Sequence, residues 1–395
     1  MHVYRHRLEW KRHPPGLLRH NEAQSRSVCL IAPMNKTEWL GTLAAAAVVA
    51  TACSSSYPSA IPPKSTSTPR ACAAVQPVPP LAASGPSNRN LVLGKLSGSD
   101  RTVVRDITDI THPMTLATGV LPTRPRFVSA TDVSYVDQAG NLIRFAYSSS
   151  TRTEVAACAG QFDWNADATA VVYTTQTDSG ASLHQLSAGH DVAIDTLPIG
   201  SSVGCESQSC ADAWDSRLSY SPDGASISLL RNIGQFVFRI WTSDGKLVKS
   251  FDSQQATMSA WSGKSLYFRD DKGVEVWRDG AVSLFLPGVA WIRPKVSPSG
   301  GEIAYEARDS AGLAHAYVVD TGSAKVRDLG KGRAEPAFIT SSWIWYEGER
   351  LCVSSDPCPV APTMLTGKTY IYDLQDSSET ESRITTVYDV WPHPA

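Results

Sequence analysis

The feature that most constrains the fold of this chain is a pair of apolar residues, one position apart, that recurs about every forty residues. The first members of successive pairs are separated by 42, 38, 56, 39, 37 and 41 residues. Alternation within each pair is the period of a β-strand, in which every second side chain points to the same face. A fixed period of this length indicates a repeat architecture. The pairs are Leu91/Leu93, Val133/Tyr135, Val171/Tyr173, Ile227/Leu229, Leu266/Phe268, Ile303/Tyr305 and Ile344/Tyr346.

A tight turn precedes these pairs, and its clearest copy is S-P-D-G at residues 221–224. Pro222 favours the φ of the first corner, Asp223 can accept a hydrogen bond from the nearby backbone, and Gly224 adopts a positive φ without steric cost. A variant, V-S-P-S-G-G, begins at Val296. A second turn and a third strand follow each pair, and a fourth strand follows in most units. No segment with a 3.6-residue period is longer than two turns, which argues against a helical bundle.

Four short strands in every forty residues are typical of a β-propeller blade. The S-P-D-G turn with its following I-x-L or I-x-Y pair resembles the repeat of the TolB-type, WD-like propellers of exported bacterial proteins. We therefore predict an all-β fold over residues 90–395, a seven-bladed β-propeller of four-stranded antiparallel blades. A two-sheet sandwich would not explain the regular spacing.

The two ends of the propeller segment predict how the ring closes. The first unit lacks a strand before Leu91, because the preceding residues are rich in proline. The segment around Val390 and Trp391 is a strand with no unit of its own. We predict that this C-terminal strand joins the first blade and closes the ring.

The chain before the propeller contains an export signal. Residues 1–33 are rich in Arg and His and are interpreted as a leader or an upstream extension; the second is favoured because Met34 opens a compact signal. The signal occupies residues 34–52, and its apolar run, Leu40 to Val49, is too short to span a bilayer.

The residues around Cys53 resemble the lipobox of bacterial lipoproteins. This resemblance implies a lipid on the Cys53 thiol, and a cysteine that carries more than one acyl chain anchors a protein stably. The alternative is an ordinary secreted protein in which Cys53 lies near the cleavage site by chance. With the lipid, we expect a monomer held at the bacterial cell envelope with its body outside the cytoplasm.

Residues 53–89 are predicted to be a disordered tether. Residues 54–89 contain eight Pro and eight Ser, and such a segment buries too little surface to offset its ordering entropy. Residues 1–52 hold seven of the 36 Lys/Arg and three of the 38 Asp/Glu, so the remaining chain has 29 bases and 35 acids, a charge of −6. This balance, without a basic patch, argues against nucleic acid and anionic lipid surfaces as partners. The expected partner is an unknown protein, peptide or envelope glycan.

The cysteines predict disulfides. Apart from Cys29 and Cys53, six cysteines remain, an even number in an exported chain. The predicted pairs are Cys205–Cys210, Cys352–Cys358 and Cys72–Cys158, the last tying the tether to the second blade. No CxxC spacing and no neighbouring His supports the alternative of a metal site, so neither a metal nor a cofactor is expected.

The sequence favours a binding function over a catalytic one. Residues 200–204 match G-x-S-x-G, but they do not lie between a strand and a helix of an α/β sheet, which a hydrolase nucleophile requires. The histidines of the body are interpreted as surface or loop residues. Five aromatic residues on or beside the innermost strands are candidates for a binding surface in the channel, the alternative being that they fill the wedges between blades. These residues are Trp164, Tyr220, Trp261, Trp291 and Trp391.

One enzymatic alternative remains. Glycosidases need two carboxylates that flank the scissile bond. The innermost strands contribute Asp163, Glu335 and Asp389 at the channel mouth. A glycosidase-like activity is therefore the second hypothesis.

Overall fold

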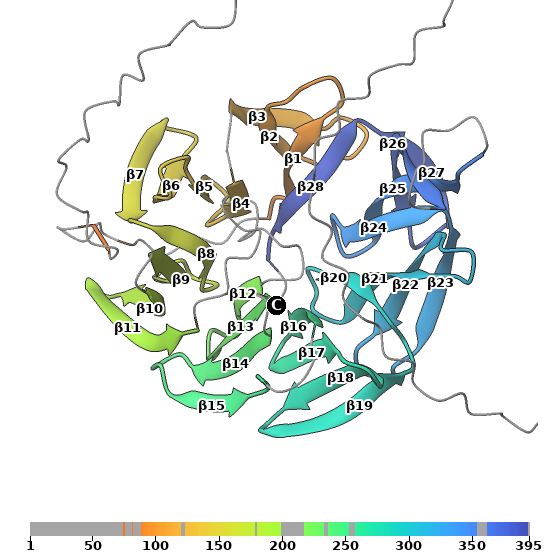
Figure 1. The fold of residues 1–395 in the computed structure, drawn as a ribbon. Helices are drawn as coiled ribbons and strands as arrows, with labels where there is room; N and C mark the ends of the chain where they lie inside the picture. Colours follow the sequence, from red (N-terminus) through yellow and green to blue (C-terminus); the bar gives the residue numbers. More distant parts are fainter. Residues whose placement is uncertain are drawn as a thin grey trace, which may run out of the picture. The chain divides into compact units, whose positions relative to one another are not determined.

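The protein folds into seven four-stranded antiparallel sheets arranged in a ring (Figure 1). A computed structural model describes residues 74–75, 81, 88–119, 123–177, 180–198, 217–232, 236–252, 257–353 and 362–393. Among these residues no helix is long and apolar enough to cross a membrane. The predicted seven-bladed propeller is confirmed.

Each blade runs from an innermost strand at the channel to an outermost strand at the rim (Figure 1). In that order, blades 1 to 3 consist of β28 (Ile384–Trp391), β1 (Leu91–Leu96), β2 (Thr102–Asp106) and β3 (Met114–Gly119); β4 (Thr123–Phe127), β5 (Asp132–Val136), β6 (Leu142–Ala146) and β7 (Thr151–Ala156); and β8 (Ala159–Trp164), β9 (Ala170–Thr177), β10 (Gly180–Ser187) and β11 (His190–Leu197). Blades 4 and 5 consist of β12 (Arg217–Tyr220), β13 (Ser226–Asn232), β14 (Phe236–Thr242) and β15 (Leu247–Ser250); and β16 (Thr257–Ser262), β17 (Ser265–Arg269), β18 (Gly273–Arg278) and β19 (Ala281–Pro287). Blades 6 and 7 consist of β20 (Ile292–Val296), β21 (Glu302–Arg308), β22 (Ala314–Asp320) and β23 (Val326–Lys331); and β24 (Arg333–Phe338), β25 (Trp343–Leu351), β26 (Thr363–Asp373) and β27 (Glu379–Ser382).

The C-terminal strand completes the first blade. β28 pairs antiparallel with β1, with Leu91 opposite Trp391 and Val92 opposite Val390. Strand β1 would otherwise present an unpaired edge at the seam of the ring. The predicted closure is therefore confirmed.

The repeated turn and apolar pair have the same place in the blades. Each apolar pair lies on the second strand of its blade, and in blades 2 to 7 the turn before it joins that strand to the innermost one. In the Ser221–Gly224 turn, the amide of Gly224 donates to the Ser221 carbonyl (2.8 Å), and the Ala225 amide donates to the Asp223 carboxylate (3.1 Å). Gly224 has a φ of 68°, as the turn requires.

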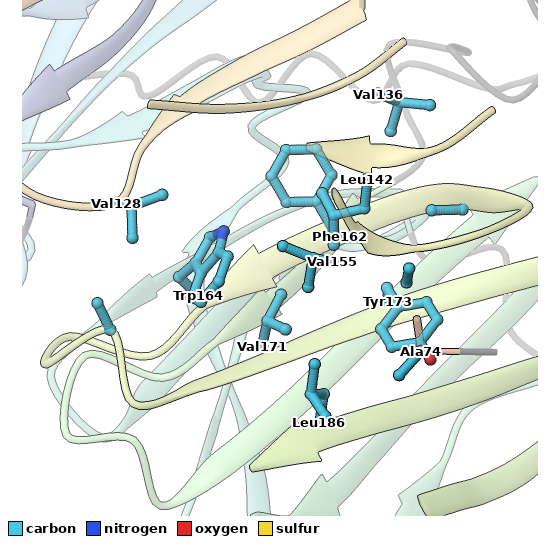
Figure 2. Packing of buried hydrophobic residues seen from close by; sticks show 13 residues of the cluster. Ala74, Val128, Val136, Leu142, Val155, Phe162, Trp164, Val171, Tyr173 and Leu186 are labelled. Atoms are coloured by element: carbon cyan, nitrogen blue, oxygen red, sulfur yellow. The ribbon is translucent and has the colours of Figure 1, made fainter. Parts of the chain in front are cut away.

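Among the described residues, the hydrophobic core consists of seven clusters, one between each pair of neighbouring blades. Figure 2 shows the cluster between blades 2 and 3, in which Phe162 and Trp164 lie among aliphatic side chains of both sheets. Because the last cluster joins blade 1 to blade 2, the apolar contacts run around the whole ring. The channel wall is thus set by tightly packed strands.

A short N-terminal segment docks on the ring. Ala74 forms an antiparallel bridge with Ala156, and its amide donates to Oδ2 of Asp191 (3.0 Å). Ala74 is buried in the cluster of Figure 2. The predicted tether therefore includes at least one point of contact with blades 2 and 3; most of its residues lie outside the described residues.

The predicted disulfides are described only in part. Cys158 and Cys352 are both disulfide-bonded. The other members of the predicted pairs, Cys72, Cys205, Cys210 and Cys358, lie outside the described residues, as do Cys53 and residues 200–204. The three pairings stay predictions.

Candidate functional site

The central channel holds a cavity of about 140 Å³ at the end where the innermost strands finish. Charged side chains from five blades line it: Arg126 on β4, Asp163 on β8, Arg217 on β12, Lys295 on β20 and Asp389 on β28. His393, two residues after β28, completes the charged set. These residues are far apart in the sequence, and closure of the ring brings them together.

One cation of the cavity has a carboxylate partner. Nη1 of Arg126 lies 2.5 Å from Oδ1 of Asp163. The other oxygen of Asp163 accepts a hydrogen bond from the backbone amide of Tyr220 (2.8 Å). Burial opposes the charge on Arg126, but Asp163 and Asp389 outweigh it and raise the pKa of the guanidinium. This ion pair forms part of the cavity wall.

The second carboxylate is also engaged. Oδ2 of Asp389 accepts a hydrogen bond from the amide of Phe127 (2.8 Å) and lies 3.0 Å from Nε2 of His393. Burial alone would raise the pKa of Asp389, but His393 and then Arg126 lower it below its usual range. The same contact raises the pKa of His393 against the effect of burial. Asp389 is therefore held as a carboxylate.

Two cations of the cavity have no such partner. Within the part of the chain that the structure describes, Arg217 and Lys295 form no ion pair and no side-chain hydrogen bond, and the Nε of Arg217 is buried without an acceptor. Burial, together with repulsion from Arg126, lowers the pKa of Arg217 to about 10. Burial and the neighbouring Arg217 and Arg126 lower the pKa of Lys295 to about 8. The wall thus carries uncompensated positive charge.

The five candidate aromatic residues are buried between blades. Each belongs to a different inter-blade cluster. Only Trp164, Tyr220 and Trp261 also border the cavity, whereas Trp291 and Trp391 do not. Packing between blades, the alternative considered above, accounts for the burial of all five residues.

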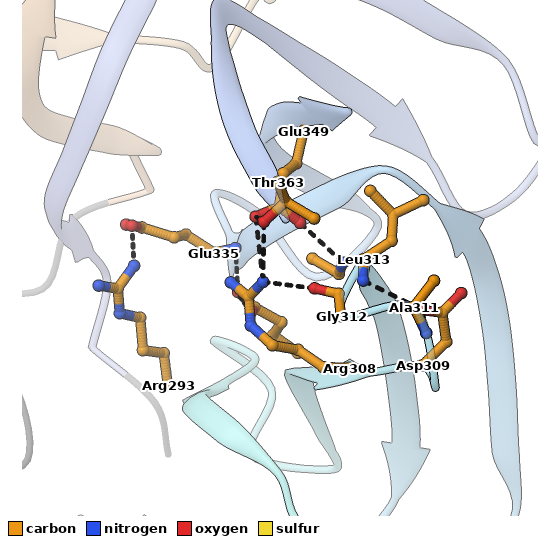
Figure 3. Close-up of polar contacts among 11 residues, drawn as sticks. Arg293, Arg308, Asp309, Ala311, Gly312, Leu313, Glu335, Glu349 and Thr363 are labelled. Carbon is orange, nitrogen blue, oxygen red and sulfur yellow. Dashed lines mark hydrogen bonds and ion pairs between the residues drawn. The ribbon is translucent and has the colours of Figure 1, made fainter. Parts of the chain in front are cut away.

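The three candidate carboxylates do not come together. Asp163 and Asp389 line the cavity, but Glu335 forms an ion pair with Arg293 outside its lining (Figure 3). The amide of Glu335 donates to buried Glu306 (3.0 Å). Figure 3 shows that neighbouring Arg308 and Glu349 belong to a further polar network between blades 6 and 7. Glu335 is thus part of a structural contact.

The prediction that the histidines of the body are surface or loop residues is wrong for two of them. His184 and His315 lie on the strands β10 and β22, with only 12 % and 10 % of their side chains exposed. His393 lines the cavity. Among the described residues, no group of three or more His, Cys, Asp or Glu side chains could hold a metal ion.

A second cavity, of about 610 Å³, lies between blades 7 and 1 near their outer strands. Its wall includes Arg105 and the apolar side chains of Ile107, Trp343 and Ile371. The Arg105 guanidinium donates to the carbonyl of Pro113 (2.8 Å). This cavity is larger, but the central one gathers charges from five blades and is the better candidate for a site.

Sequence reasoning missed the cations of the central cavity. The sequence does contain a signal for some of these charges. The last residue of an innermost strand pairs with the first residue of the apolar pair that follows it. The position just before that last residue is occupied by Arg126, Asp163 and Lys295. Arg217 stands at the start of its strand and carries no such mark.

Comparison with known proteins supports the fold. No protein-family model and no curated protein matches the chain. Among solved structures, a prolyl endopeptidase is 10 % identical over 74 % of this chain and 50 % of its own, with a TM-score of 0.50. TolB from Acinetobacter baumannii is 15 % identical over 76 % of this chain and 66 % of its own, with a TM-score of 0.43. A puromycin-hydrolyzing peptidase from Mycobacterium tuberculosis is 12 % identical over 78 % of this chain and 57 % of its own, with a TM-score of 0.47.

In fold the chain is a seven-bladed β-propeller. At these identities the likeness concerns the fold alone. The chain spans less than two thirds of the length of each of the three proteins, 66 %, 57 % and 50 %.

Proposed function

We propose that this TolB-like propeller is an exported binding module that is held at the cell envelope by a lipid on Cys53. It binds a protein, peptide or envelope glycan in its central cavity, without catalysis. The observation that carries the proposal is that the cavity presents two cations without partners, Arg217 and Lys295. A cavity lined by such groups is complementary to a ligand rather than to the protein itself.

The engagement of the two carboxylates favours binding over hydrolysis. A glycosidase needs one protonated carboxyl group as its acid, which requires a raised pKa. The pKa of Asp389 is lowered by His393 and Arg126 despite burial. Asp163 is paired with Arg126. A volume of about 140 Å³ is also small beside the roughly 300–1,000 Å³ of typical ligand pockets, so the cavity suits one end of a ligand.

A photo-crosslinking experiment tests this function. A photoreactive amino acid replaces Tyr388, which lines the cavity, or Val282, which is exposed on the outermost strand β19. Irradiation of the mature lipidated protein in envelope preparations should capture a ligand from position 388 and not from position 282. Equal capture from both positions, or capture from neither, would count against a ligand in the cavity.

The glycosidase-like alternative has a specific observation in its favour, since two carboxylates line one cavity. It predicts hydrolysis of envelope glycan fragments that is abolished in both Asp163→Asn and Asp389→Asn. The binding proposal predicts no hydrolysis by the unaltered protein.

A further inference from the structure

We propose that the central cavity contains an oxyanion subsite, in which Arg217 and Lys295 together bind a terminal carboxylate or phosphate group of the ligand. This inference rests on the proposed binding function and names the chemical group that the cavity recognises.

Two strong hydrogen-bond donors of the cavity have no acceptor among the described residues. The carboxylate of Asp163 already accepts from Arg126 and Tyr220, and that of Asp389 accepts from Phe127 and contacts His393. The cations of the lining without an acceptor among the described residues are the ammonium of Lys295 and the guanidinium of Arg217, whereas Oδ1 of Asp389 accepts no hydrogen bond from those residues. A group that only accepts hydrogen bonds complements this set.

The unpaired cations indicate a ligand because the protein alone does not satisfy them. Arg217 and Lys295 are half-buried. A charge that is partly withdrawn from water without a partner is unfavourable, and cations in such places are ordinarily paired. Arg126 shows the ordinary arrangement in the same cavity, with Asp163 at 2.5 Å. Arg217 and Lys295 lie on blades 4 and 6, so an anion between them would compensate both charges.

The residue types fit an oxyanion. The planar guanidinium of Arg217 offers two parallel N–H groups to a carboxylate or phosphate, and the ammonium of Lys295 adds a compact charge. The cavity of about 140 Å³ admits such a terminal group and not an extended polymer. A carboxylate would come from a peptide terminus, an acidic side chain or a uronic acid, and a phosphate from a phosphorylated glycan or polymer.

The test is a titration of the full mature protein with inorganic phosphate, acetate, galacturonate and, as the uncharged match, galactose. Binding is measured by calorimetry and by the shift in melting temperature. We expect saturable binding of phosphate or of the two carboxylates and none of galactose, and the preferred probe distinguishes the two sources. Galactose binding as tight as that of galacturonate would overturn the proposal, as would an absence of saturable binding of every anion.

Three variants tie the binding to the subsite. Arg217→Met and Lys295→Met should each weaken anion binding at least tenfold, the size expected for the loss of a charge-assisted hydrogen bond. The control Lys264→Met removes an exposed cation of the turn after β16 and should bind as the unaltered protein does. Circular dichroism verifies that each variant is folded. Equal losses in the Lys264 and Lys295 variants would mean that the anions bind by general charge attraction.

The pH dependence of the anion affinity distinguishes a direct role of Lys295 in binding from a merely structural role. Affinity should fall as the pH rises above about 8, where Lys295 loses its proton, and Lys295→Arg should keep its affinity to higher pH. The other charged groups that face Lys295 are Arg126, Arg217, Asp389 and, on its own strand, Arg293, with Asp163 and His393 in the same cavity. His393→Gln separates the titration of that imidazole from the effect of Lys295. An affinity unchanged between pH 7 and 10 would contradict the role of Lys295.

The two proposals fail separately. If position 388 captures a ligand and the anions do not bind, the binding module stands and the oxyanion subsite is wrong. If anions bind in the manner predicted and no envelope ligand is captured, the subsite stands and the proposed envelope ligand is wrong.

Discussion

The backbone amide of Phe127 donates a 2.8 Å hydrogen bond to Oδ2 of Asp389, which lies 262 residues later in the chain. The bond joins the innermost strands of blades 1 and 2. An innermost strand has no neighbour on its channel side, so its amides need other acceptors. Asp163 satisfies the amide of Tyr220 in the same way between blades 3 and 4. These carboxylates stabilise the ring by joining neighbouring blades.

Loss of the C-terminal strand should weaken the whole propeller. Deletion of residues 389–395 removes Trp391 and Val390, whose burial contributes about 1.5–3 kcal/mol each, together with strand hydrogen bonds. We expect a loss of several kcal/mol in the free energy of unfolding and a tendency to aggregate, measured by urea and thermal unfolding. Truncation after His393 is the control. A deletion variant that melts at the unaltered temperature would contradict the energetic role of the closure.

The contact between Asp389 and His393 should make the stability of the ring depend on pH. The pKa of the His393 imidazole is raised in the folded protein. Its contribution to the free energy of unfolding is therefore complete below pH 6.5, the ordinary pKa of histidine, and disappears as the pH rises through the raised pKa. The lowered pKa of Asp389 means that its contribution is lost in acid, below its ordinary value of 3.8. The stability difference between the unaltered protein and His393→Gln should therefore be largest between about pH 4 and 6.5 and should shrink in alkali.

Urea unfolding from pH 4.5 to 9 measures this difference. His190→Gln changes an exposed histidine on β11 and is the control. A His393→Gln difference that is constant across this range would argue against the ion pair.

Substitution by Met should affect the stability of the protein differently at Arg126 and at Arg217. Arg126→Met leaves Asp163 without its cation and should destabilise the protein by roughly 1–3 kcal/mol. Arg217→Met removes a cation without a partner among the described residues, so it should leave stability unchanged or raise it by up to about 1 kcal/mol. Denaturant titrations of both variants measure the contrast. Equal destabilisation would imply that Arg217 has a structural partner.

The disulfide pairings predicted from the sequence can be mapped directly. Peptide mapping of the oxidised protein under non-reducing conditions should recover Cys72–Cys158, Cys205–Cys210 and Cys352–Cys358. Cys158 and Cys352 are disulfide-bonded, and Ala74 pairs with Ala156 beside Cys158. The first bridge would thus fix the N-terminal segment where it already contacts the ring. A free thiol at any of the six positions under denaturing conditions would show that its pairing is wrong.

The lipid anchor is tested by one substitution. Cys53→Ala should release the protein from the membrane fraction, because the proposed acyl chains are its only expected anchor. Fractionation and immunoblotting measure the distribution, with Cys29→Ala as the matched control. A Cys53→Ala protein that still sediments with membranes after a salt wash would refute the lipidation.

The sequence by itself determined the fold, because blade structure is local. The turn at Ser221–Gly224 and the alternation of Ile227 and Leu229 are set by φ preferences and strand period, which neighbouring residues decide. Counting these units predicted seven blades, and the strand left over at Val390 predicted the closure. Each step needed only contacts within a blade or between the two ends of the chain.

The tertiary structure alone decided which charges meet. Arg126 and Lys295 have the same place in the repeat and Arg217 does not. The three side chains converge because the ring places blades 2, 4 and 6 around one axis. Several innermost strands contain register shifts, as between Ile292 and Lys295, and a shift reverses which side chains face the channel. Whether a carboxylate of this wall is free or already bound, as Asp389 is by Phe127, depends on contacts between distant segments that no local pattern encodes.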